Sequence, residues 1–368
     1  MSLESLNLRL GSASGTLRCD DGVLNVALVI PLQGPAGIFG PSCELCAQLA
    51  AEEVNTEGGV LGRELRLLAV DGGAAPTTVA AEVEALVSMG VVGAITGWHI
   101  SAVRREIVPR ISGRVPYVYT AVYEGGEHTP GVFVTGETPH GQLLPGMALL
   151  TAEFGVRRWC VVGNDYIWPR RSARAAHRYA RDTGTSICDE IYVPLGTEDF
   201  DAVLTRVARS GADAVLILLV GDDAVRFNRA FGRAGLDQQC RRLATLMDEN
   251  MLLATGATGT VGLYATSGYF ETLATPESLD FAGRYARRFG VEAPPVGNLG
   301  ESCYEGVRLL AALIDRARTT DVPAISAVAD SVRYAGPRGE ISLRNRHVAQ
   351  RIYLAAADAM DFHVLTQL

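Results

Sequence analysis

Short apolar runs alternate along this chain with longer segments in which apolar residues recur at helical spacing. Residues 26–30 are apolar and end at Pro31, which predicts a strand buried on both faces. Residues 42–57 carry an apolar helical face, and Ser42 is placed to cap that helix. A second strand is expected at residues 65–70. Strand, helix and strand joined by short connections build parallel sheets.

A faint internal repeat relates residues 77–97 to residues 201–221. Each stretch has an apolar helical face, a glycine that ends the helix, and a strand that ends at Gly97 or Gly221. The repeat predicts that the chain builds one kind of α/β lobe twice.

The predicted fold class is therefore α/β, with two Rossmann-like lobes, parallel sheets and a hinge of three segments. An N-terminal extension covers residues 1–22. The first lobe is expected at residues 23–139 plus 268–336, and the second at residues 140–267 plus 337–368. The ligand cleft would lie between the lobes, because clefts between domains are common ligand sites.

The last third of the chain predicts two helices and then short strands. Residues 276–290 and 301–318 carry apolar faces at helical spacing, and these helices are expected to pack on the first lobe. The short strands from Gly339 to His363 are expected to close the second lobe.

Length and composition narrow the class of protein. A chain of 368 residues exceeds what one core supports, which is about 250 to 300 residues. The net charge of -8 argues against a direct nucleic-acid partner. The chain contains no Lys, which excludes a phosphate-binding GxxxxGK[ST] loop and a Schiff-base lysine. No cofactor is expected.

Cysteine spacing and hydropathy suggest no metal site and no membrane span. Cys43 and Cys46 form a single CxxC inside a predicted helix, without a second pair or a nearby His, and are interpreted as ordinary helix residues. No apolar run reaches the length of about 18 residues that a span needs. The first 22 residues do not match a secretory signal. A native N-terminus would imply a cytoplasmic protein, and a removed signal a periplasmic or extracellular one.

Candidate ligand-binding residues stand at the ends of the predicted strands, where α/β sheets bind ligands. Trp98, His99 and Ser101 follow one strand of the first lobe. Ser101 begins a helix, so its hydroxyl and the free amides of the first turn are placed either to hold a ligand oxygen or merely to cap the helix.

Aromatic residues with polar tips follow strands in both halves. Tyr119 and Thr120 end a strand of the first lobe, and Tyr166 and Trp168 follow one of the second. Such rings line small-ligand pockets and also fill ordinary cores, so both interpretations stay open.

Two further strand ends add Val220 and Gly221, followed by Asp222, and Asp248 with Glu249. A carboxylate here would accept hydrogen bonds from ligand nitrogens. Helix capping is an equally natural role for Asp222.

Catalytic signatures are missing from the sequence. The six His residues form no HExxH motif, and there is no GxSxG. An amide hydrolase would have to use Ser101 with His99, two residues apart at a helix start, where side chains face different ways. No catalytic residue is therefore predicted.

From about residue 24 to 365 the chain resembles the type I periplasmic binding proteins of the branched-chain amino acid receptor family. VALVIPLQGP and NTEGGVLGREL are typical of the whole family. TGWHIS (96–101), YTAVYEGGEHTPGVFVTGETPHGQLLP (119–145) and GNDYIWPR (163–170) resemble its amide and urea branch. That branch holds the amide sensor of amidase operons and the urea receptors of ATP-driven transporters.

The resemblance implies roles for individual residues. Ser101 and its neighbouring amides would hold the ligand carbonyl, and Tyr119, Tyr166 and Trp168 would wall the pocket. Ala121 and Val122 stand where the amide sensor has Thr and Pro, so the hydroxyl expected at residue 121 for an acetamide site is missing. His99 and Trp168 each occupy a place where that sensor has Tyr.

The function expected from the resemblance is reversible binding of a short amide, a urea-like compound or an amino acid by lobe closure. The partner would be the membrane permease of an ABC-type uptake system. The alternative is a cytoplasmic sensor that acts on a regulatory protein of transcription antitermination, and an amide hydrolase is the third. A homodimer is also compatible with the resemblance.

Overall fold

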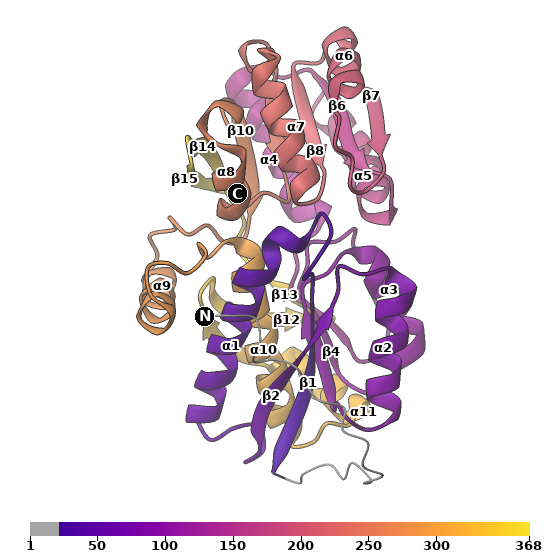
Figure 1. The fold of residues 1–368 in the computed structure, drawn as a ribbon, viewed down its shortest axis with the longest axis vertical. Helices are drawn as coiled ribbons and strands as arrows, with labels where there is room; N and C mark the ends of the chain where they lie inside the picture. Colours follow the sequence, from indigo (N-terminus) through magenta and orange to yellow (C-terminus); the bar gives the residue numbers. More distant parts are fainter. Residues whose placement is uncertain (1–21) are drawn as a thin grey trace.

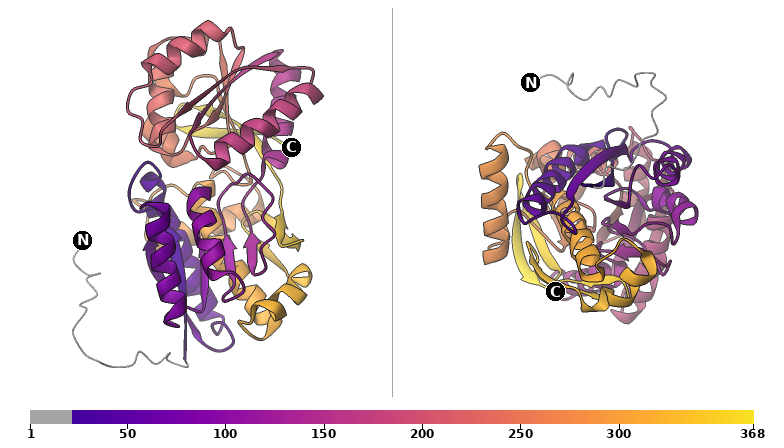
Figure 2. Two further views of the ribbon diagram at one scale, coloured as in Figure 1. Left: turned by 90° about the vertical axis from the view of Figure 1, so that its right-hand side faces the viewer. Right: turned by 90° about the horizontal axis from the view of Figure 1, so that it is seen from below.

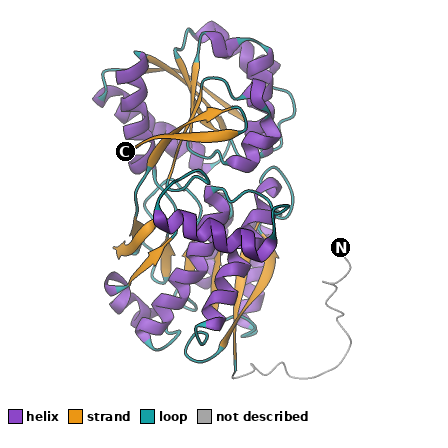
Figure 3. Cartoon of the chain, turned by 90° about the vertical axis from the view of Figure 1, so that its left-hand side faces the viewer, coloured by secondary structure: helices purple, strands orange, loops and turns teal. Residues whose placement is uncertain are grey.

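The chain folds into two α/β lobes stacked along the long axis of the molecule (Figure 1). A computed structural model describes residues 22–368, and Cys19 lies outside these residues. Figure 3 shows helices on both faces of the strands in each lobe. The prediction of two α/β lobes is confirmed, because each lobe has its own sheet.

The first sheet has eight strands in the order β11-β12-β13-β5-β4-β3-β1-β2. Its β1 to β5 portion is parallel, whereas β11, β12 and β13 pair antiparallel with one another. The strands are β1 (Val23–Ile30), β2 (Glu64–Asp71), β3 (Ala94–Gly97), β4 (Tyr117–Tyr119), β5 (Val132–Val134), β11 (Arg333–Gly336), β12 (Gly339–Arg344) and β13 (His347–Ala349).

Helices cover both faces of this sheet. Helices α1 and α10 pack together on one face, and α2 and α3 on the other (Figure 1). Of the two helices predicted in the last third, α10 packs on β3 and β4, whereas α9 lies on the outer side of α1 and not on the sheet (Figure 1 and Figure 2). The helices of this lobe are η2 (Gly37–Phe39), α1 (Gly40–Thr56), α2 (Pro76–Ser88), α3 (Ser101–Ile111), α9 (Pro276–Phe289), α10 (Asn298–Ala317), α11 (Val322–Val328) and η5 (Ala329–Ser331).

The second sheet has seven strands in the order β15-β14-β10-β9-β8-β6-β7. Its five central strands, from β10 to β7 in this order, pair parallel. At one edge β14 pairs antiparallel with β10, and β15 pairs antiparallel with β14. The strands are β6 (Arg158–Asn164), β7 (Ser186–Val193), β8 (Ala214–Leu218), β9 (Arg241–Ala244), β10 (Leu263–Ser267), β14 (Tyr353–Asp358) and β15 (Asp361–Gln367). The helices are α4 (Pro139–Phe154), α5 (Ile167–Asp182), α6 (Asp201–Ser210), α7 (Asp222–Arg233), η3 (Leu236–Gln238), α8 (Glu249–Thr255) and η4 (Ala257–Gly259).

Central strands are apolar because helices cover both of their faces. All residues of β3, β4, β5 and β8 are buried, as expected for the middle of a doubly covered sheet. The sheets are nevertheless mixed rather than wholly parallel, since the antiparallel strands sit at their edges.

The assignment of residues 339–349 to the second lobe is wrong. Strand β13 pairs with β5 of the first sheet, through His347 and Val134, and the amide of Val134 donates to the carbonyl of Arg346 over 2.9 Å. The free edge of β5 offers unpaired backbone groups that this hairpin satisfies. Only β14 and β15 join the second sheet, so the third crossing lies between residues 349 and 353.

Six cysteines lie in the described part of the chain, and all are free. Cys43 and Cys46 are fully buried in α1, and Cys43 Sγ lies 3.5 Å from the carbonyl oxygen of Leu299 in α10. No helix within residues 22–368 has both the length and the apolar character that a membrane crossing requires.

Candidate functional site

The start of α3 faces the second lobe and carries the first candidate residue, Ser101. Gly97 precedes it with φ +130°, and a Cβ there would lie 2.3 Å from the carbonyl oxygen of Val29. Glycine therefore lets this loop lie directly on β1. Ile100 is the N-cap residue and no side chain caps the helix, so the capping role considered for Ser101 is wrong.

Ser101 is buried, and its Oγ has no hydrogen-bond partner within residues 22–368. It lies near the Tyr119 hydroxyl: burial raises the pKa of that phenol, and the nearby Ser101 hydroxyl offsets a part of the rise, although the contact falls outside hydrogen-bond geometry. A buried hydroxyl without a partner costs about 1 to 3 kcal/mol. The amides of Val103 and Arg104 already donate to the carbonyl of Ile100, so the Ser101 hydroxyl and the amides of Ser101 and Ala102 are the donors left for a ligand oxygen.

Both ring nitrogens of His99 contact other residues of the first lobe. It is fully buried, its Nδ1 lies 3.1 Å from the carbonyl oxygen of Val29, and its Nε2 lies 2.6 Å from the Tyr117 hydroxyl. Burial lowers its pKa to about 3, so the ring is neutral. With both nitrogens engaged, His99 cannot serve Ser101 as a base, and the hydrolase alternative loses the base that it requires.

Aromatic residues of the first lobe lie near Ser101, and Tyr166 of the second lobe lies within electrostatic range of Tyr119. The Tyr119 hydroxyl donates to the carbonyl of His99 over 2.8 Å, and Trp98 packs edge-on against Phe39 with ring centres 4.9 Å apart. Burial raises the pKa of Tyr166 in the second lobe, and the Tyr119 phenol adds to this rise.

Tyr166 and Trp168 belong to the start of α5. Tyr166 is the N-cap residue of that helix, and its ring centre lies 6.3 Å from that of the buried Trp168. Ser101 and Tyr119 therefore lie together in the first lobe, whereas no hydrogen bond or ring contact among the described residues joins Tyr166 or Trp168 to them.

The lobes touch at Gly221. The amide of Asp222 donates to the carbonyl of Pro35 over 2.9 Å, which joins the loop after β8 to the loop after β1. Gly221 has φ +51°, and a Cβ on it would lie 1.9 Å from the same Pro35 oxygen. The neighbouring amide of Val220 is held by Asn164 Oδ1 at 2.8 Å.

The two acidic candidates lie at the start of α8. Asp248 caps the helix by accepting from the amide of Met251 over 3.1 Å, and burial raises its pKa to about 6. Glu249 is buried, with Oε1 accepting from the amide of Glu271 over 2.7 Å. Its Oε2 has no partner among the described residues, and burial raises its pKa well above the ordinary value.

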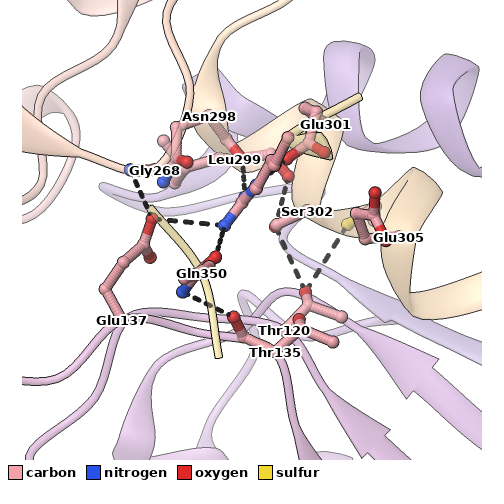
Figure 4. Close-up of polar contacts among 12 residues, drawn as sticks. Thr120, Thr135, Glu137, Gly268, Asn298, Leu299, Glu301, Ser302, Glu305 and Gln350 are labelled. Atoms are coloured by element: carbon pink, nitrogen blue, oxygen red, sulfur yellow. Dashed lines mark hydrogen bonds and ion pairs between the residues drawn. The ribbon is translucent and has the colours of Figure 1, made fainter. Parts of the chain in front are cut away.

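The remaining candidates face the interior of the first lobe. Thr120 Oγ1 lies 3.4 Å from Ser302 Oγ and 3.9 Å from Cys303 Sγ, both on α10 (Figure 4). Ala121 and Val122 are buried, and Gly136 lies against the backbone of Ala121. These three positions are not brought together with Ser101 by any contact that the structure shows.

The chain matches the family model described as periplasmic binding protein over residues 23–361. The chain belongs to this family. Among curated relatives, the Leu/Ile/Val-binding protein homolog 6 of Brucella suis biovar 1 is 28% identical over 228 residues, which is 58% of this chain and 56% of that protein. The homolog of the same name from Brucella abortus (strain 2308) has the same identity and coverage. The match thus spans just over half the length of these relatives.

Solved structures of such binding proteins share the fold. A solute binding protein of an ABC transporter from Rhodopseudomonas palustris HaA2, in complex with p-hydroxybenzoic acid, is 20% identical with a TM-score of 0.85, over 94% of this chain and 97% of that one. A branched-chain amino acid transporter substrate binding protein from Streptococcus pneumoniae, in complex with isoleucine, is 16% identical with a TM-score of 0.80, over 94% and 98%.

One residue of this periplasmic binding protein was not predicted from its sequence. Arg104 of α3 is buried, and its Cζ lies 5.1 Å from the ring centre of Tyr119. Its Nη2 donates to Glu124 Oε1 over 2.8 Å, while Nη1 and Nε make no hydrogen bond within residues 22–368. The signal was its spacing, since a residue three positions after Ser101 lies on the same helical face.

A buried ionic cluster joins the three crossings between the lobes (Figure 4). Glu137 of the first crossing accepts from the amide of Gly268 in the second over 2.8 Å. Gln350 of the third crossing donates to the carbonyl of Thr135 over 3.0 Å. Arg338 lies 3.3 Å from Glu137 and also contacts Gln350, so one guanidinium connects all three.

Carboxylates outnumber cations in this cluster. Arg338 pairs with Glu301 of α10, and Glu305 lies next to Glu301. Because one guanidinium cannot balance three buried carboxylates, burial and repulsion from Glu305 and Glu137 raise the pKa of Glu301 to about 8, and burial raises that of Glu305.

We expect the stability of the protein to fall as the pH rises from about 5 to 8, between the ordinary pKa of a Glu carboxyl and the raised pKa of Glu301 in the folded state. The raised pKa of Glu301 means that the folded state keeps a proton that the unfolded state has already released, so this contribution is complete below the ordinary pKa of 4.5, declines steadily as the pH rises, and is gone above about pH 8. Chemical denaturation across this range should give a shallower slope for Glu301→Gln than for the wild type. The exposed Glu340→Gln is the control, and equal slopes in all three proteins would contradict the expectation.

Proposed function

We propose that this chain is a solute receptor that closes its two lobes reversibly around one small polar molecule and presents it to the membrane permease of an ABC-type uptake system. The family supports solute binding, and the curated relatives named above are Leu/Ile/Val-binding homologues. The observation that carries the proposal is the buried Ser101 hydroxyl without a hydrogen-bond partner among residues 22–368, beside the phenol of Tyr119.

The proposed ligand has an oxygen acceptor at one end and nitrogen donors at the other. Ser101 and the first amides of α3 would donate to a carbonyl or carboxylate oxygen. The free Oε2 of Glu249 would accept from an amide or ammonium nitrogen. A short amide, a urea-like compound and an amino acid all carry both features. Tyr119, Tyr166 and Trp168 would form the flat walls.

The proposed mechanism couples binding to closure. A ligand shifts the balance between open and closed lobes only through contacts that it makes better in the closed form. Ser101 and Tyr119 come from the first lobe, and Tyr166 and Trp168 from the second, so a ligand that touches all four stabilises the closed form. The permease would then recognise that form.

Replacement of Ser101 or Trp168 by Ala is expected to weaken ligand binding at least tenfold, about 1.4 kcal/mol. Ser101→Ala removes the donor to the ligand oxygen, and Trp168→Ala removes a wall. Calorimetry against urea, acetamide, butyramide, leucine and glutamate would identify the ligand class and measure the losses.

Ser112→Ala, at the exposed far end of α3, is the matched control and should bind as the wild type does. Unchanged affinity in both site variants would place the ligand elsewhere. Ammonia release from an amide in the same samples would show hydrolysis and refute a purely binding role.

A further inference from the structure

A hollow lies between the lobes, and none of the predicted ligand-binding residues lines it. Its volume is about 640 Å³, within the range of small-molecule sites. One wall is α5 of the second lobe, and the opposite wall is the loop at residues 123–128 with the β12–β13 turn of the first.

The walls are basic. Arg171, Arg174 and Arg178 line the hollow from α5, and Arg344 lines it from the β12–β13 turn. None of these four arginines forms an ion pair with a carboxylate of residues 22–368, although Arg170 on the same helix pairs with Asp165 at 2.6 Å.

The remaining polar lining does not offset these charges. The other polar residues that line the hollow include three histidines and one carboxylate. That carboxylate is Glu124, whose Oε1 already forms an ion pair with Arg104 at 2.8 Å. The protein as a whole carries a net charge of -8. The four guanidinium groups repel one another because no carboxylate of residues 22–368 pairs with them. The charge around the hollow is therefore positive, opposite in sign to the net charge of the protein.

We propose that this hollow binds a small polyvalent oxyanion, whose charges are carried by phosphate or carboxylate groups. The planar guanidinium donates two parallel hydrogen bonds to either group, which suits Arg better than a point charge. Three of the arginines occupy positions 171, 174 and 178, a helical spacing that places them along one face of α5. The fourth approaches from the other lobe.

The position of Arg344 gives the site a consequence for closure. An anion that contacts α5 and the β12–β13 turn together bridges the two lobes at a point away from Ser101. Such an anion stabilises the lobe spacing of this structure, and by linkage it would raise affinity at the ligand cleft. This consequence rests on the proposed closure, whereas the anion site itself does not.

Calorimetry with pyrophosphate and with citrate at fixed ionic strength tests the site and separates the two sources of charge. We expect at least one of these anions to bind, and Arg174→Gln and Arg344→Gln each to weaken it at least fivefold. Arg181→Gln, an exposed position at the end of α5 outside the hollow, is the matched control and should leave binding unchanged.

Each other outcome overturns the proposal in a distinct way. An equal loss of anion affinity in Arg181→Gln would indicate general charge attraction. A loss of affinity in Arg174→Gln but not in Arg344→Gln would indicate that the anion binds to one face of α5 and not between the lobes. Binding of a hexa-aspartate peptide without either small anion would make the hollow a docking surface for an acidic segment. None of these results depends on Ser101 or on the identity of the cleft ligand. Failure of the anion site would therefore leave the proposed function untouched.

Discussion

Replacing Arg338 by Met should lower the free energy of unfolding by about 3 to 5 kcal/mol, the usual cost of removing one partner from a buried ionic cluster. The side chains of Arg338 and Glu137 are each 1% exposed, and that of Glu301 is fully buried. Met fills much of the volume of Arg but leaves Glu137, Glu301 and Glu305 without a cation. Denaturant titration of the purified variant measures the loss.

A second substitution separates charge from packing in the same cluster. Glu301→Gln in the Arg338→Met background removes one buried carboxylate, so it should recover part of the lost stability. Arg351→Met changes an exposed residue of the third crossing and should cost no more than about 0.5 kcal/mol. If Arg338→Met were as mild as this control, the cluster would not hold the crossings together.

Gly221→Ala is expected to weaken ligand binding at least a hundredfold, about 2.7 kcal/mol, by keeping the lobes apart. The new Cβ would lie 1.9 Å from the carbonyl oxygen of Pro35 on the other lobe, and that oxygen belongs to backbone that cannot rotate away as a side chain can. The closed form is therefore blocked, while each lobe keeps its own core. Calorimetry gives the affinity, and solution scattering should give a larger radius of gyration.

Gly235→Ala controls for backbone strain, because Gly235 also has a positive φ, of +67°, but a Cβ there meets no atom within 4 Å. Both variants lose some stability from the positive φ. Only Gly221→Ala should lose affinity and expand. Equal affinity in the two variants would mean that the contact between Gly221 and Pro35 does not form in the bound protein.

Local patterns in the sequence were sufficient to predict the two lobes. The helix and strand at residues 201–221 follow from apolar spacing, and the structure places α6 and β8 there, with the strand ending at Leu218. The place of β12 and β13 could not be predicted in the same way, since it depends on which sheet has a free edge. That edge belongs to β5, more than 200 positions earlier in the chain.

The candidate site was predictable where a strand end leads directly into a helix. Ser101 and Tyr166 lie at such ends, and the structure places Ser101 near the Tyr119 hydroxyl, while the binding role of both residues stays a prediction. Thr120 illustrates what sequence position cannot give, because alternate residues of a strand point to opposite faces. Its hydroxyl faces α10, and the buried Arg104 beside Tyr119 became visible only in the folded chain.

Closure of the lobes around a ligand is tested most directly by solution scattering. The wild type is measured with and without the compound of the calorimetry panel that binds. The radius of gyration should fall on ligand addition for the wild type and stay unchanged for Ser101→Ala at the same ligand concentration. Saturated binding with no change in the wild-type profile would contradict closure around a ligand.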